Sequence, residues 1–173
     1  MYTNKDKDVL IADLEDALVN EFRIFQSLVE KSKSELDALT RHDVQVLLGL
    51  VEQKETLLDE LGRTEDVRRI ITEDLAHLTG LESALPTVSE VVPILGGPVS
   101  ERLMRIQEGI LALGSEIKIL NRSNLALAQA ALEWADATQV FLLSLYQPEL
   151  DNYQPPGKYP RSDAAVRSFD QRV

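Results

Sequence analysis

Cysteine is absent from this chain of 173 residues, and aromatic residues make up only 5% of it. The absence of cysteine excludes disulfides, thiolate nucleophiles, iron–sulfur clusters and cysteine-ligated zinc. So few aromatic residues are ordinary in a helical bundle and low for a β-sandwich. Because hydrophobic residues still account for 44% of the chain, the composition allows a packed core.

Long hydrophobic runs are also missing. No stretch of about 18 apolar residues is present to form a transmembrane helix. The N-terminal segment MYTNKDKDVLIADLED has no apolar stretch long enough for a signal peptide. We therefore expect a cytoplasmic protein without membrane insertion.

Basic residues are outnumbered by acidic ones, 18 against 29, which gives a formal net charge of −11. Residues 147–173 contain four acidic and four basic side chains, so the whole excess lies in residues 1–146. Such a surface repels nucleic-acid phosphates and anionic membranes, and nucleic acid is not an expected partner. The charge fits either simple solubility, which is the more common case, or contact with a basic partner.

Residue patterns of enzymes and metal sites are missing as well. The sequence contains no GxxxxGK[ST] loop, no G-x-S-x-G elbow and no Ser/His/Asp set. Asp74 and His77 match half of the carboxylate-x-x-His pattern of a di-iron bundle, but the second half is absent. We therefore expect no catalytic residue, no metal site and no cofactor.

Apolar residues instead recur at steps of three and four, which is the spacing of amphipathic helices. This spacing predicts three long helices, over residues 8–40, 44–79 and 99–146. Asp43 is the expected N-cap of the second helix, and Gly80 is expected to follow its end. Gly62 is a candidate weak point within the second helix.

A connector over residues 81–98 separates the second and third long helices. It contains three prolines and two glycines, which prevent a long helix. Its TVSE sequence fits a capping box, so one short helix is expected at 88–95.

The predicted fold is all-α. It is an elongated antiparallel helical bundle or coiled coil of three long helices with a short connector helix. Residues 1–146 form the predicted helical domain. Residues 147–173, with four prolines, form a predicted flexible C-terminal tail.

The helix predicted over residues 99–146 has the strictest pattern. Steps of three and four residues alternate along it without a slip, which is a coiled-coil signature. With Leu103 at heptad position a, Asn124 also lies at a, and Asn121 lies at e. Asn124 either sets the register through a hydrogen bond to a neighbouring helix or serves as an amide in a groove for a partner helix.

A second apolar stripe begins beside the first at Leu125 and continues through Leu132 to Tyr146. Two stripes make a face wider than one antiparallel neighbour covers. This helix would be about 70 Å long, against about 50 Å for each of the others. We therefore expect uncovered apolar surface, which usually marks a partner site, unless the connector covers it or the helix bends.

Three motifs together resemble the FlgN-type flagellar export chaperones. They are HDVQVLLGLVEQKETLLDELGRTEDVRRII from residue 42, LNRSNLALAQAALEW from residue 120 and NYQPPG from residue 152. The resemblance extends over residues 10–157, which is most of the chain.

The resemblance implies a small helical cytoplasmic protein that binds the C-terminal helical segments of hook-associated proteins. Such a protein keeps these subunits from assembling early and delivers them to the export gate component FlhA. In the family, the C-terminal part of the chain binds the subunit, and a tail tyrosine is implicated in docking at the gate. The partner-binding candidates here are Asn121, Asn124, Leu125, Leu132, Tyr146 and Tyr153. Tyr153 is the best match to the tail tyrosine, although Tyr146 and Tyr159 lie near it.

The same heptads support a second hypothesis, in which the chain is a structural coiled-coil protein without a client. Such a protein would self-associate through the helix over residues 99–146 and bury its apolar stripes in a symmetric homodimer. A chaperone that hides its client groove by dimerising would combine the two hypotheses.

Overall fold

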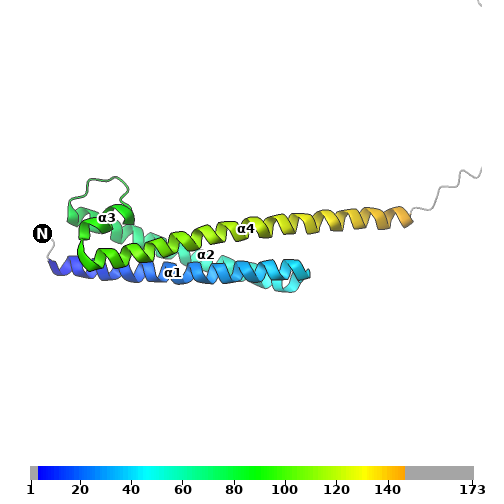
Figure 1. Ribbon diagram of the computed structural model, residues 1–173, viewed down its shortest axis with the longest axis horizontal. Helices are drawn as coiled ribbons and strands as arrows, with labels where there is room; N and C mark the ends of the chain where they lie inside the picture. Colours follow the sequence, from blue (N-terminus) through cyan, green and yellow to red (C-terminus); the bar gives the residue numbers. More distant parts are fainter. Residues whose placement is uncertain (1–3, 147–173) are drawn as a thin grey trace, which may run out of the picture. The chain divides into compact units, whose positions relative to one another are not determined.

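The computed structural model describes the backbone of residues 4–146 and the side chains of residues 6–146. Within this range it has no strand and four helices: α1 (Asn4–Arg41), α2 (Val44–Thr79), α3 (Val88–Leu95) and α4 (Gly97–Tyr146) (Figure 1). The predicted all-α fold, with three long helices and a short connector helix, is confirmed. The predicted tail, with Tyr153 and Tyr159, lies outside the described residues.

Helix α2 has the bounds that the sequence predicts, and both of its ends are capped. The Asp43 carboxylate accepts a hydrogen bond from the backbone N–H of Val46 at 3.1 Å. At the other end Gly80 adopts a left-handed conformation with φ of 71°. Its backbone N–H donates a hydrogen bond to the carbonyl oxygen of His77 at 3.3 Å. Gly62 does not interrupt the helix.

Helix α3 also has its predicted bounds, because a capping box fixes its start. The Glu90 carboxylate accepts hydrogen bonds from the N–H of Thr87 at 2.8 Å and from its hydroxyl at 2.9 Å. These bonds lower the pKa of Glu90. Helices α1 and α4 begin slightly before the predicted residues, at Asn4 and Gly97.

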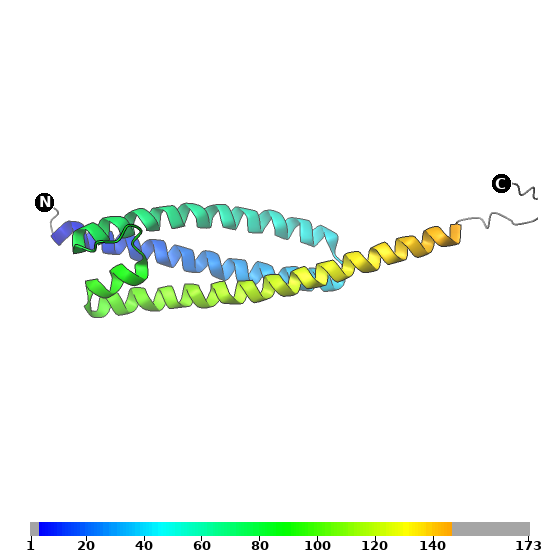
Figure 2. The same cartoon turned by 90° about the horizontal axis from the view of Figure 1, so that it is seen from above.

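The chain divides into two compact units, Met1–Leu132 and Glu133–Val173. In the first unit α1 and α2 form an antiparallel pair, joined by a short turn at residues 42–43. The first part of α4 lies along this pair and is antiparallel to α2, with α3 between α2 and α4 near one end (Figures 1 and 2). Of the second unit, the structure describes residues 133–146, the last turns of α4.

The main core joins all four helices at the end of the first unit that contains α3. Its fully buried members include Leu14 from α1, Leu75 from α2, Val91 and Val92 from α3, and Leu103 from α4. Because α3 packs into this core, it does not cover Leu125 and Leu132 of α4, which are exposed. The connector helix therefore leaves this part of the second stripe uncovered.

Two glycines of α4 allow aromatic rings of α1 to approach its backbone. A Cβ added to Gly109 would lie 2.8 Å from a ring carbon of Phe22, whereas one added to Gly114 would lie 3.5 Å from a ring carbon of Phe25. The first distance is shorter than normal contact and the second is ordinary. Only Gly109 is therefore required for this packing.

We expect Gly114→Ala to raise the free energy of unfolding by about 0.5–1 kcal/mol, because alanine is the better helix former. Gly109→Ala brings the same gain in helix propensity, but the added Cβ forces the Phe22 ring to move. We therefore expect no net stabilisation from this substitution. Urea unfolding followed by circular dichroism measures both variants. Equal stabilisation by the two substitutions would contradict the close approach at Gly109.

Candidate partner-binding surface

Asn124 of α4 is only 4% exposed and is hydrogen-bonded to α1. Its Nδ2 donates to the carbonyl oxygen of Ser32 at 2.9 Å and to Oε2 of Glu35 at 2.7 Å. The same Glu35 oxygen pairs with Nζ of Lys54 from α2 at 2.8 Å. One amide and one ion pair thus connect α1, α2 and α4, and the predicted hydrogen bond from Asn124 to a neighbouring helix is confirmed.

The two acceptors around Asn124 also fix the orientation of its amide. A flipped amide would place Oδ1 against two other oxygens, so the nitrogen has to face α1. Oδ1 is then buried, and it has no hydrogen-bond partner within the described part of the chain. Moving the amide away from Ser32 and Glu35 would leave its donors unpaired as well, at about 1–3 kcal/mol. The site therefore favours one register of α4 on α1.

Asn121 differs from Asn124, although it is only three residues away. Its side chain is exposed, and its Oδ1 accepts from the hydroxyl of Ser32 and from Nζ of Lys54, both at 3.5 Å. Asn121 thus contributes an acceptor at the edge of the cluster, whereas Asn124 contributes a donor at its centre.

Two of the predicted partner-binding residues lie exposed on α4 in the first unit. Leu125 directly follows Asn124 and is 59% exposed, and Leu132 is 66% exposed. Their neighbours on the coiled-coil seam, Leu127 and Ala131, are half-buried. The second stripe therefore begins to be uncovered where the polar cluster ends.

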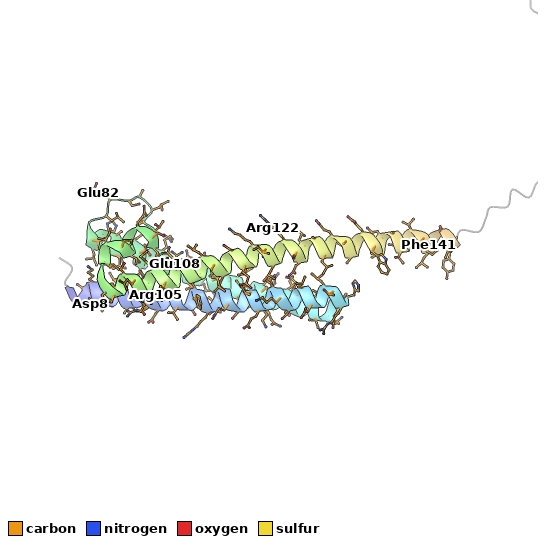
Figure 3. The ribbon with its side chains drawn as sticks, in the orientation of Figure 1. Asp8, Glu82, Arg105, Glu108, Arg122 and Phe141 are labelled. Atoms are coloured by element: carbon orange, nitrogen blue, oxygen red, sulfur yellow. The ribbon has the colours of Figure 1, made fainter. Side chains whose placement is uncertain are left out.

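The described residues of the second unit expose large apolar side chains on every side of the helix. Tyr146, another predicted site residue, is 83% exposed, and Trp134 is 70% exposed. The other large exposed apolar residues are Val140, Phe141, Leu142, Leu143 and Leu145. Figure 3 shows the Phe141 ring standing out from the helix. Residues 133–146 include only two charged residues, Glu133 and Asp136.

One face of this segment forms a shallow apolar groove. Trp134, Thr138, Leu142 and Tyr146 follow one another at four-residue steps along it, and Leu143 lies beside them. Leu142 lies between Leu132 and Tyr146 on the predicted second stripe. Trp134 lies at a seam position, d, of the heptad that starts at Leu103, and the structure places it in the exposed groove.

A buried acidic residue, Glu21 of α1, was not predicted from the sequence. Its Oε1 pairs with Nε of Arg68 from α2 at 2.6 Å. Burial raises the pKa of Glu21 above its ordinary value of 4.5, and the charge of Glu65 adds to this effect. The hydrogen bond and charge of Arg68 oppose it but do not cancel it.

The raised pKa of Glu21 predicts a pH dependence of stability. The folded state holds the proton more tightly than the unfolded state, so the added stability is present below pH 4.5 and is lost as the pH rises through the folded pKa. Glu21→Gln removes this titration. The unfolding free energy of the wild type, relative to Glu21→Gln, should therefore fall between pH 4 and pH 7 in paired urea titrations. A difference that rises over this range would contradict the prediction.

Over residues 6–146 no group of three or more His, Asp or Glu side chains is placed to hold a metal ion. No helix in the same range is long and apolar enough to cross a membrane.

An all-α fold that leaves one end of a helix apolar and exposed is typical of proteins that bind other helices. A family model described as FlgN protein matches residues 1–161, so the chain belongs to the FlgN family. This family is one of chaperones in flagellum assembly. The match includes all three motifs on which the predicted resemblance rested. No curated protein and no solved structure matches the chain.

Proposed function

We propose that this protein is a cytoplasmic chaperone of flagellar type III export. It binds the C-terminal helical segments of hook-associated proteins, prevents their premature assembly and delivers them to the export gate component FlhA. Family membership supports the general role. The exposed apolar segment of α4 from Trp134 to Tyr146 is the observation that supports client binding.

The physical properties of this segment suit reversible capture of a helix. An amphipathic client segment would place its apolar face on the groove of Trp134, Leu142 and Tyr146. If the client segment folds on binding, its ordering offsets part of the interaction energy, so the affinity is moderate and release is feasible. Both properties suit a chaperone that has to release its client at the export gate.

The predicted site residues have different parts in this proposal. Leu125, Leu132 and Tyr146 contact the client, with Asn121 at the edge of the contact surface. Asn124 acts indirectly, because its amide is engaged with α1 and holds α4 in register. Tyr153 is proposed for contact with the gate.

Titration of the purified chain with the C-terminal segment of a hook-associated protein tests the proposal. We expect a 1:1 complex by calorimetry and a gain of helical signal in circular dichroism. No binding of any such segment would contradict the function. A stable homodimer that buries Trp134 and Leu142 and binds no segment would instead support the structural coiled-coil hypothesis.

A further inference from the structure

A second apolar surface lies on the N-terminal half of α2. Val44, Leu48, Val51 and Leu58 are between 46% and 61% exposed and follow one another at helical spacing, so they share one face. We call these four residues the α2 strip. Helix α2 contacts α1 through a different face, which includes the buried residues Leu50 and Leu61. The α1–α2 pairing therefore does not account for the α2 strip.

The α2 strip continues the face of α2 on which α3 sits. Further steps of three and four residues along this face lead to Thr72 and Ala76, which are almost fully buried. Ala76 belongs to the same core cluster as Val91 and Val92 of α3. One end of the face thus already holds a short apolar helix, and the other end is open.

The open end is also strongly acidic. Between Val44 and Gly62 the chain has four acidic residues, Glu52, Glu55, Asp59 and Glu60, and a single basic one, Lys54. The Lys54 ammonium is engaged with Glu35 of α1. Within the described residues none of the four acidic side chains forms an ion pair. Glu52, Glu55 and Asp59 lie beside or within the strip, and all three are exposed.

We propose that the α2 strip docks a basic amphipathic helix of a second partner protein. Val91 and Val92 of α3 already pack in one cluster with Ala76, which continues this face of α2. The unpaired carboxylates select lysine and arginine on the flank of that helix. A second copy of this chain is disfavoured because the chain carries a formal net charge of −11. The α2 strip shares no residue with the client-binding segment proposed on α4.

Two synthetic three-heptad peptides test this surface. Both have leucine on one helical face, and they differ only in carrying lysine or glutamate on the flanks. We expect the lysine peptide to bind the full chain, with an affinity that falls as salt rises, and the glutamate peptide to bind at least about tenfold more weakly. Fluorescence anisotropy measures both. Equal binding of the two peptides, or no binding of either, would overturn the proposal.

Two variants test whether the lysine peptide binds at the α2 strip. Leu58→Glu should weaken binding of the lysine peptide at least about tenfold, because it places a carboxylate in the apolar contact. Val67→Glu is the matched control, since Val67 is similarly exposed but lies on the face of α2 beside Asp13 and Asp16 of α1. Equal losses in the two variants would mean that the peptide does not sit on the α2 strip.

A charge variant tests the selectivity and leaves the apolar residues intact. Replacing Glu52 and Glu55 with Gln and Asp59 with Asn should weaken binding of the lysine peptide and flatten its salt dependence. This variant decides the outcome if Leu58→Glu loses helical content. Binding of the hook-associated segment should survive in every α2 variant, and its absence in the wild type would contradict only the client proposal. A homodimer that Leu58→Glu dissociates would instead show that a second copy occupies the strip.

Discussion

Asn124→Asp is expected to lower the free energy of unfolding by about 3 kcal/mol, which is among the largest effects of any single substitution in this chain. The substitution keeps the size of the side chain and replaces the donating Nδ2 with an oxygen. That oxygen would face the Ser32 carbonyl and the Glu35 carboxylate, at the positions now occupied by hydrogen bonds of 2.9 and 2.7 Å. A buried carboxylate would then lie against a second carboxylate and have lost both partners.

Asn121→Asp provides the matched control three residues away. Asn121 uses its oxygen, which accepts from Ser32 and from Lys54, and aspartate keeps that acceptor. Because the side chain is exposed and the added charge faces an ammonium, we expect a change within about 0.5 kcal/mol. The same chemical replacement should therefore strongly lower the free energy of unfolding at Asn124 and leave it nearly unchanged at Asn121.

Urea unfolding at several pH values measures both variants. The loss of unfolding free energy caused by Asn124→Asp should shrink as the pH falls, because two adjacent carboxylates that share a proton no longer repel each other. Equal effects at the two positions, or a deficit that is independent of pH, would show that Asn124 does not donate to α1 as the structure has it.

Loss of client binding is the second large effect that we expect. Leu132→Glu and Leu142→Glu should each weaken binding of the hook-associated segment by at least about 100-fold, or roughly 3 kcal/mol. Both side chains are exposed, at 66% and 48%, so their replacement leaves the core intact. In the complex each glutamate would be buried against the apolar face of the client without a partner charge.

Gln129→Glu is the control for this pair. It adds the same charge to an exposed position of α4 and removes no apolar side chain. Calorimetric titration should give wild-type affinity for this variant, and circular dichroism should confirm the helical content of all three proteins. Wild-type affinity in Leu132→Glu and Leu142→Glu would contradict the placement of the client on this part of α4.

The helices of this protein could be predicted from its sequence because their determinants are local. Apolar spacing defined three long helices, and the caps at Asp43, Gly80 and Thr87 fixed the ends of α2 and the start of α3. The heptad count also identified Asn124 as the polar residue on the α4 seam. Each of these inferences depends on residues within a few positions of one another along the chain.

The partners of the polar residues could not be predicted in this way. Glu35 and Lys54 look like ordinary charges of solvated helix faces, yet they meet Asn124 from two other helices at a single point. Glu21 looks equally ordinary, and it is buried only because α2 covers it and places Arg68 beside it. Burial and pairing of this kind depend on contacts between residues far apart in sequence.

Sequence alone therefore determined the helices, their ends, the apolar stripes of α4 and the resemblance to FlgN proteins. The tertiary structure alone decided which parts of these stripes are covered. Helix α3 packs into the main core and covers neither Leu125 and Leu132 of α4 nor the α2 strip, and these side chains are exposed. The physical reason is that periodicity records which face of a helix is apolar, whereas exposure depends on which other helix packs against that face.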